Sequence, residues 1–105
     1  MKEIGPVELK QLIDEKKDFQ LIDVREAHEL DICNINGDHI PLNEIPHHVD
    51  KIDREKQVVI YCRSGSRSGN IIRWLEQNHA FENLYNLKGG ILAWSDQIDP
   101  SMPKY

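Results

Sequence analysis

A run of four β-forming residues at positions 58–61 (VVIY) constrains the fold of this chain more than any other segment. No polar residue interrupts the run, which is typical of a central strand in a parallel sheet that is covered on both faces. The chain passes at once into the Gly- and Ser-rich stretch from Cys62 to Gly69. A helical pattern of apolar residues then continues to about Asn78. A strand, a tight turn and a helix in this order favour an α/β fold.

Predicted strands and helices also alternate along the rest of the chain. Helical spacing of Leu9, Leu12 and Ile13 predicts a first helix from Pro6 to about Lys16, because proline suits the first turn of a helix. The other predicted elements are a buried strand at 19–25, a short helix at 26–31, a mostly irregular stretch at 34–46, a strand at 84–87 and a last helix at 91–97. Strands that alternate with helices predict a layered fold with a mainly parallel sheet.

Size and composition are those of one soluble globular domain. With 105 residues and no repeat or linker to divide them, we expect a single domain over residues 1–105. The formal net charge of −5 argues against nucleic acid and anionic membranes as partners. No stretch approaches the roughly 20 apolar residues of a membrane-spanning helix. The N-terminus lacks the apolar run of a signal peptide, so we expect a cytoplasmic protein.

The chain has two cysteines, Cys33 and Cys62, which lie far apart in the sequence and in no metal-binding spacing. A disulfide between them stays open on the sequence alone, although a reduced cytoplasmic protein is the simpler interpretation. The five histidines also lack the spacing of a zinc site, so we expect neither a metal nor a cofactor. No histidine is placed by the sequence as a base for Cys62.

Cys62 stands at the carboxyl end of the predicted central strand, directly before a turn and a helix. Ligands of open α/β sheets bind at this edge. The helix start offers unpaired N–H groups and a positive dipole end, and Gly65 lets successive N–H groups curl around an anion. Arg63 and Arg67 add positive charge, and Arg67 is spaced to grip an oxyanion at the far end of the loop. We therefore expect a thiolate nucleophile beside a small-anion pocket.

A free cysteine is more often a small buried hydrophobic residue without chemistry. The neighbours of Cys62 argue against that interpretation, because Arg-Ser-Gly-Ser-Arg is a poor environment for a neutral thiol and a good one for its anion. Cys33 has no such neighbours. We therefore interpret Cys62 as functional. Cys33 keeps the commoner interpretation of a buried residue without chemistry.

Three motifs in order resemble the rhodanese-like domain family, and the resemblance covers nearly the whole chain. They are Leu-Ile-Asp-Val-Arg-Glu at 21–26, the strand and cysteine loop at 59–68, and a Gly-Gly-x-x-x-Trp signature within 86–94. The resemblance implies a three-layer α/β fold, in which helices flank a central, mainly parallel sheet of about five strands. It also implies that Cys62 carries sulfur as a persulfide between a donor and an acceptor. Whether Cys33 lies near enough to Cys62 to resolve that persulfide stays open on the sequence.

The resemblance also assigns roles to individual residues. Cys62 would be the catalytic, persulfide-bearing nucleophile. Its anion-binding loop would consist of Arg63, Ser64, Gly65, Ser66, Arg67 and Ser68. Asp23 and Arg25 match supporting positions, and we interpret them as a structural ion pair or turn contact rather than as catalytic groups. Gly89 and Gly90 would permit a tight turn near the site.

Loop length separates two activities that are known for such cysteine loops. The resemblance implies that sulfurtransferases of this family have four residues between the cysteine and the closing arginine, and that the related phosphatases have five. Four residues separate Cys62 from Arg67, which favours sulfur transfer. The predicted function is a thiosulfate sulfurtransferase, with a small anionic donor such as thiosulfate and with cyanide, a thiol or a protein as acceptor. A persulfide relay between partner proteins, a phosphatase or arsenate reductase, and a non-catalytic regulatory domain stay open as alternatives.

The sequence departs from the family pattern in two places. Asn34 stands where many members have histidine, and Asp38 stands where a small residue is usual. The end of the long helix lacks the usual glycine, so we expect Asn78 or His79 to take the left-handed cap conformation. Neither departure touches the cysteine loop.

Overall fold

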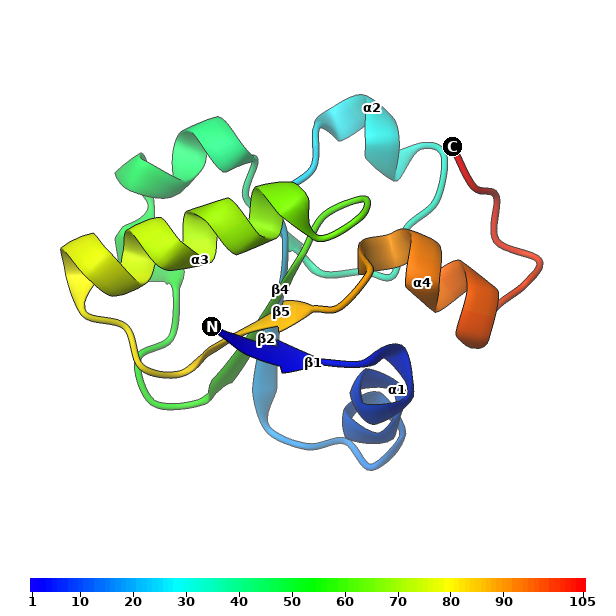
Figure 1. The fold of residues 1–105 in the computed structure, drawn as a ribbon, viewed down its shortest axis with the longest axis horizontal. Helices are drawn as coiled ribbons and strands as arrows, with labels where there is room; N and C mark the ends of the chain where they lie inside the picture. The colour runs from blue at the N-terminus through cyan, green and yellow to red at the C-terminus, as the bar shows by residue number, and fades with distance from the viewer.

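Five parallel strands form one sheet in the computed structural model, which describes all 105 residues (Figure 1). The strands are β1 (Lys2–Ile4), β2 (Phe19–Asp23), β3 (Asp38–His39), β4 (Gln57–Tyr61) and β5 (Leu84–Leu87). The helices are α1 (Pro6–Asp14), α2 (Ala27–Leu30), α3 (Ser66–His79) and α4 (Gly90–Gln97), with two 3-10 helices, η1 (Leu42–His47) and η2 (Val49–Lys51). The strand order is β1-β5-β4-β2-β3, and every neighbouring pair is parallel.

β4 lies at the centre of the sheet, and its side chains alternate between two cores. Val58 and Ile60 pack in a core with buried residues of α3 and η1, namely Ile45, Ile71, Ile72 and Leu75. Val59 and Tyr61 pack in a second core on the other face, with Leu9 of α1 and with Ile91 and Trp94 of α4. The sheet is therefore the middle one of three layers, and the predicted α/β fold is confirmed.

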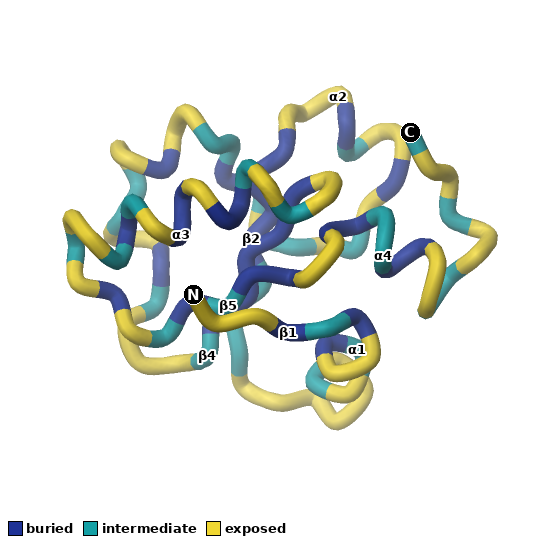
Figure 2. The backbone as a smooth tube through the Cα atoms, viewed as in Figure 1, coloured by how far each residue is buried: buried dark blue, intermediate teal, exposed yellow.

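Burial follows these layers. Figure 2 shows the buried positions along the strands and on the inner sides of α3 and α4, with exposed positions on the outer turns. All of residues 58–62 are buried, as the uninterrupted apolar run predicts. No helix has both the length and the apolar character to cross a membrane.

Two short strands were not predicted. β1 pairs with β5, and β3 pairs with only the last two residues of β2. Both are edge strands of three residues or fewer, too short for a periodic pattern to reveal. The predicted strand at 19–25 ends at Asp23, although the N–H of Val24 still donates to the Tyr61 carbonyl at 3.1 Å.

The left-handed residue at the end of α3 is Ala80, with φ of 55°, so the expectation of Asn78 or His79 is wrong. The amide of Asn78 donates to the carbonyl of Trp74 within the helix. The carbonyl of His79 accepts a hydrogen bond from Arg54 at 2.5 Å. These contacts keep both residues helical, and the chain reverses one residue later.

Candidate active site

The Cys62 sulfur lies in a ring of hydrogen-bond donors at the carboxyl end of β4. Its Sγ accepts from the N–H of Gly65 at 3.1 Å and from the N–H of Ser68 at 3.4 Å. The hydroxyl of Ser68 lies 3.3 Å from the same sulfur. Ser68 belongs to the first turn of α3, so the sulfur occupies the place of a helix-capping group. Such a place favours an anion.

Hydrogen bonds from the start of α4 hold the first residues of the cysteine loop in place. The Cys62 carbonyl accepts from the N–H of Ile91 at 3.0 Å, and the Arg63 carbonyl accepts from the N–H of Leu92 at 3.1 Å. These two bonds tie the first residues of the loop to the N-terminal turn of α4. Gly65, with φ of 106°, provides the left-handed turn into α3.

Gly90 allows α4 to approach the loop this closely. A Cβ atom on Gly90 would lie 2.3 Å from the Arg63 carbonyl oxygen and 2.7 Å from the Ser64 nitrogen. Both of these atoms are backbone and cannot rotate away. The φ values of 78° for Gly89 and 62° for Gly90 are also left-handed. The two glycines thus sit in the tight turn that the sequence suggests for them.

Asn86 on β5 is a site residue that sequence reasoning missed. Its side-chain amide donates to the Gly65 carbonyl at 3.0 Å, and its Oδ1 accepts from the Ser68 hydroxyl at 2.5 Å. Asn86 and Ser68 are both buried. A buried amide that ties two loop residues to the sheet fixes the direction of the donors around Cys62. A lone Asn in the apolar strand Leu84–Leu87 was the available signal.

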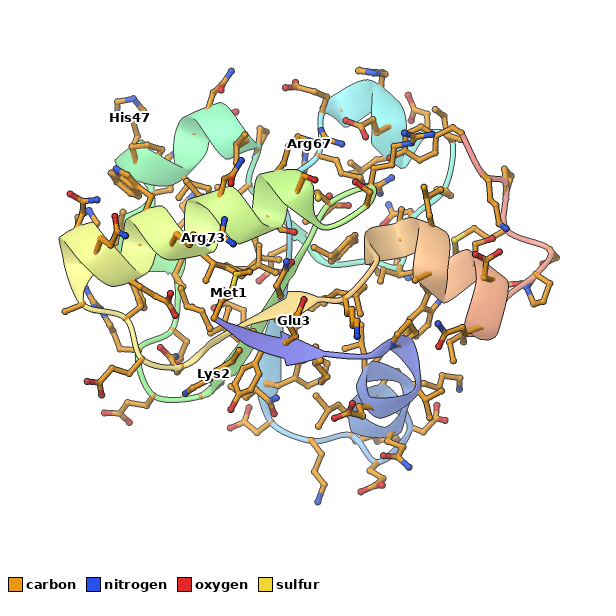
Figure 3. The ribbon with its side chains drawn as sticks, viewed as in Figure 1. Met1, Lys2, Glu3, His47, Arg67 and Arg73 are labelled. Carbon is orange, nitrogen blue, oxygen red and sulfur yellow. The ribbon has the colours of Figure 1, made fainter.

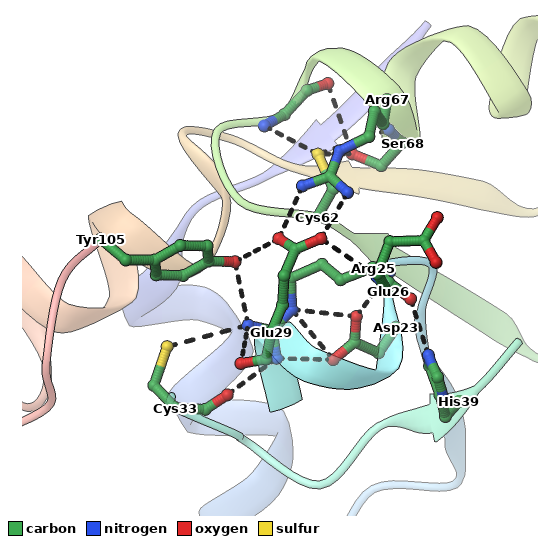
Figure 4. Close-up of polar contacts among 11 residues, drawn as sticks. Asp23, Arg25, Glu26, Glu29, Cys33, His39, Cys62, Arg67, Ser68 and Tyr105 are labelled. Atoms are coloured by element: carbon green, nitrogen blue, oxygen red, sulfur yellow. Dashed lines mark hydrogen bonds and ion pairs between the residues drawn. The ribbon is translucent and has the colours of Figure 1, made fainter. Parts of the chain in front are cut away.

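Arg67 does not point an unpaired guanidinium into the loop. Its two terminal nitrogens bind both carboxylate oxygens of Glu29 on α2, at 2.7 and 2.8 Å (Figure 4). Figure 3 shows Arg67 directed toward α2, whereas Arg73, further along the same helix, lies on the side of Met1 and Glu3. Pairing with Glu29 raises the pKa of Arg67 above its usual range. Sequence reasoning missed this partner, which is 38 residues away.

Glu29 is the centre of a buried hydrogen-bond network. Besides Arg67, its carboxylate accepts from the Tyr105 hydroxyl at 2.6 Å and from the N–H of Glu26 at 3.0 Å. The hydrogen bonds from Arg67, first among these causes, lower the pKa of Glu29 to about 2 against the opposing effect of burial. The group is therefore a carboxylate at any physiological pH. Neither Glu29 nor Tyr105 carries a motif that would mark it in the sequence.

Arg25 and Asp23 form the ion pair expected of them, and both side chains are fully buried. The Arg25 guanidinium also donates to the carbonyls of Glu29 and Cys33 and to the hydroxyl of Tyr105. Burial opposes this charge, but the hydrogen bonds with Asp23 and Tyr105 outweigh it and raise the pKa of Arg25. The pair supports the site from its buried side, and neither side chain reaches Cys62.

The remaining groups lie further from the sulfur. Cys33 is buried and free, as is Cys62, so the two form no disulfide. Arg63 is exposed, and its guanidinium lies 5.1 Å from the centre of the Tyr105 ring. Ser64 and Ser66 line a polar groove of about 410 Å³ on the outer side of the loop, which Cys62 does not line. No three His, Cys, Asp or Glu side chains lie close enough together to hold a metal ion.

A sequence model of the rhodanese-like domain family matches residues 5–97. The chain belongs to this family. Among curated rhodanese relatives, a putative sulfurtransferase of Bacillus subtilis, YtwF, is 36% identical over 101 residues and covers 95% of this chain, which in turn spans 96% of it. A sulfurtransferase of Allochromatium vinosum is 35% identical over 94 residues, with 89% and 87% covered.

Solved structures agree with this membership. A rhodanese-like domain protein from Staphylococcus aureus superposes with a TM-score of 0.81 at 32% identity, over 93% of this chain and 95% of that one. Other relatives are much longer. The chain spans 30% of the rhodanese-like/PpiC domain-containing protein 12 of Arabidopsis thaliana, to which it is 40% identical over 91 residues. Membership and these names support sulfur transfer as the general activity.

Proposed function

We propose that this chain is a sulfurtransferase that carries sulfane sulfur on Cys62 as a persulfide. The donor would be a small anion such as thiosulfate, and the acceptor would be cyanide, a thiol or a protein thiol. One observation carries the proposal: two backbone N–H groups of the loop point at the Cys62 sulfur at the start of α3, and the Ser68 hydroxyl lies 3.3 Å from it. That arrangement stabilises a negative charge on sulfur, which both the attacking thiolate and the persulfide need.

The first half of the proposed reaction loads Cys62. The thiolate attacks the outer sulfur of thiosulfate, a new sulfur–sulfur bond forms, and the donor's own sulfur–sulfur bond breaks. The electron pair of the broken bond leaves with sulfite, and Cys62–S–S⁻ remains. The N–H groups of Gly65 and Ser68 stay beside the sulfur throughout, so their alignment needs no reorganisation.

The second half returns the thiolate. Cyanide or a thiolate attacks the terminal sulfur of Cys62–S–S⁻, the sulfur–sulfur bond breaks, and its electron pair stays on the Cys62 sulfur. With cyanide the product is thiocyanate. Charge balances in both halves, and neither needs an oxidant, a reductant or a cofactor.

A persulfide relay between partner proteins is the second candidate. The pairing of Arg67 with Glu29 favours it, because an oxyanion donor would find only Arg63 free of a carboxylate partner. Such a relay would load poorly from thiosulfate and well from a persulfide. A phosphatase or arsenate reductase has less support, since the loop has four residues before Arg67 and that arginine is already occupied.

The test is transfer of sulfur from thiosulfate to cyanide, measured as thiocyanate for the wild type, Cys62→Ser and the matched variant Cys33→Ser. We expect transfer to fall more than about 1,000-fold in Cys62→Ser, because an alcohol is no substitute for the thiolate, and to persist in Cys33→Ser. Transfer that survives Cys62→Ser would exclude the proposed mechanism. Loading of Cys62 from a persulfide without turnover of thiosulfate would favour the relay.

A further inference from the structure

The arginine that closes the cysteine loop has its charge neutralised by a buried carboxylate. Glu29 holds the Arg67 guanidinium through two parallel hydrogen bonds of 2.7 and 2.8 Å. The side chain of Glu29 is 7% exposed and that of Arg67 is 34% exposed, so the carboxylate lies on the inner side of the pair. A two-pronged pair of this kind is strong and fixed in direction.

Glu29 cannot swing away from this position without losing other partners. Tyr105 donates to one carboxylate oxygen at 2.6 Å, and the N–H of Glu26 donates to the other at 3.0 Å. The Tyr105 hydroxyl in turn accepts from the buried Arg25 at 3.1 Å. The Glu29 carboxylate that neutralises Arg67 is therefore held in place by several hydrogen bonds.

The charges near Cys62 are consequently fewer than the loop sequence suggests. Arg63 and Arg67 would together offer two positive charges, but the pair of Arg67 with Glu29 has no net charge. Arg63 alone keeps a positive charge without a carboxylate partner, and its guanidinium lies beside the ring of Tyr105. A donor must approach the Cys62 thiolate against its negative charge, and this repulsion grows with the charge of the donor.

We propose that Glu29 is a specificity-determining residue that neutralises Arg67 and thereby selects sulfur donors with one negative charge over donors with two. This inference rests on the proposed sulfur transfer and narrows its donor from small anions in general to singly charged ones, such as a persulfide R–S–S⁻ in which R has no net charge. In the loading step the Cys62 thiolate attacks the outer sulfur of R–S–S⁻. The donor's sulfur–sulfur bond breaks, its electron pair leaves on R–S⁻, and Cys62–S–S⁻ forms.

Two donors of the same chemistry and different charge test the proposal. Thiosulfate has two negative charges, whereas methanethiosulfonate has one, and each yields its outer sulfur to a thiolate, with sulfite or methanesulfinate as the leaving group. The measurement is kcat/KM for each donor with cyanide as acceptor, at low salt. The ratio of the two values cancels any change in the reactivity of Cys62 itself.

The decisive variant is Glu29→Gln, which keeps the shape of the side chain and frees the charge of Arg67. Because Coulomb energy scales with donor charge, we expect kcat/KM to rise about tenfold for thiosulfate and about threefold for methanethiosulfonate. The ratio then moves about threefold toward thiosulfate, and high salt should reduce this gain. If Glu29 served only to hold Arg67 in place, both values would fall instead.

Two further variants bracket this result. Glu26→Gln removes one negative charge at an exposed position directly before α2, and we expect the ratio to change by less than about twofold. Arg67→Gln leaves the Glu29 carboxylate unpaired, so the ratio should move about threefold toward methanethiosulfonate. This opposite sign keeps the proposal testable even if Glu29→Gln folds poorly.

The outcomes separate the two proposals. If the wild type transfers sulfur from both donors and Glu29→Gln leaves their ratio unchanged or lowers both values, the role of Glu29 is overturned while sulfur transfer stands. If Cys62 accepts sulfur from neither donor and from no cysteine persulfide, the proposed function itself fails, and the role of Glu29 falls with it. A threefold shift in Glu29→Gln that is absent in Glu26→Gln supports both.

Discussion

The two cysteines of this chain are both buried, at 1% and 8% exposure, yet their surroundings differ in kind. Cys62 accepts from two backbone N–H groups and lies 3.3 Å from a hydroxyl. Cys33 lies 3.7 Å from a terminal nitrogen of Arg25 and forms no other side-chain hydrogen bond. Burial therefore does not separate Cys62, the proposed carrier of sulfur, from Cys33. The donors that point at the sulfur do.

The arginines beside the two cysteines also differ. Arg25 beside Cys33 is fully buried and pairs with Asp23, its neighbour but one in the sequence. Arg67 in the loop of Cys62 is partly exposed and pairs with Glu29, which lies 38 residues away. Both cysteines thus have positive charge nearby. Only Cys62 has backbone N–H groups that point at its sulfur. The following predictions test this distinction, from the largest expected effect to the smallest.

Gly90→Ala should damage the Cys62 site most. The added Cβ would lie 2.3 Å from the Arg63 carbonyl oxygen, and alanine is strained at a φ of 62°. We expect the free energy of unfolding to fall by about 3 kcal/mol and sulfur transfer to fall about 100-fold, because the loop must shift to relieve the contact. Urea denaturation and the transfer assay measure the two effects.

Gly5→Ala is the matched control for this change. Its Cβ would meet only a Glu8 side-chain oxygen, at 3.5 Å, and the φ of Gly5 is −84°. Stability should stay within about 0.5 kcal/mol of the wild type. Equal losses in both glycine variants would contradict the role given to the contact of α4 with the loop.

Glu29→Gln should lower stability in a pH-dependent way. The folded pKa of Glu29, about 2, lies below its usual value of 4.5, chiefly because of Arg67, so its carboxylate adds stability above pH 4.5. This contribution is lost as the pH falls through the folded value. We expect the variant to be less stable by about 2 kcal/mol at pH 7, with the difference shrinking as the pH falls from 4.5 toward 2.

Urea denaturation across this pH range measures the effect. Glu55→Gln is the control, since Glu55 is exposed and forms no ion pair, and it should change stability by less than about 0.5 kcal/mol at any pH. A constant difference between wild type and Glu29→Gln from pH 7 to pH 2 would contradict the ion pair of Glu29 with Arg67.

Ser68→Ala should lower sulfur transfer about tenfold, because it removes a hydroxyl 3.3 Å from the Cys62 sulfur and leaves the Asn86 Oδ1 without its donor. Ser95→Ala removes another buried hydroxyl, which donates to the Met102 carbonyl at 2.8 Å. Both variants should lose about 1 kcal/mol of stability. Only the first should lose activity, and a similar loss in both would argue against a specific role of Ser68.

Cys33→Ala should have the smallest effect on function. The variant removes a buried sulfur beside Arg25 and should lower the free energy of unfolding by about 1 kcal/mol through the small cavity that it leaves. Sulfur transfer should change by less than about twofold. A larger loss of transfer, measured in the same assay at a temperature where the variant is fully folded, would show that Cys33 takes part in the chemistry.

Much of the fold could be predicted from local patterns. The strand at 84–87 has the predicted bounds, and the predicted helices begin within a residue of their observed starts at Pro6, Ala27 and Gly90. These elements are specified by periodicity, proline and glycine within a few residues. The edge strands β1 and β3 are set instead by pairing with distant segments, which leaves no local signal.

The candidate site also has one part that local sequence predicts and another part that it does not. Residues 62–68 are contiguous, so the sequence alone places the loop at the start of a helix. The partners that complete it come from elsewhere: Asn86 reaches it from β5, and Glu29 from α2. Tyr105 meets Glu29 across 76 residues. Long-range pairs of single side chains depend on the packed structure, and one sequence cannot reveal them.

The most direct test of the central claim is the mass of each cysteine-containing peptide after the protein has met a sulfur donor. With thiosulfate or methanethiosulfonate, we predict that the Cys62 peptide gains about 32 Da, one sulfur atom, and that the Cys33 peptide gains nothing. Cyanide should then remove the added mass. Added sulfur on Cys33, or on neither cysteine with any donor, would contradict Cys62 as the carrier of sulfur.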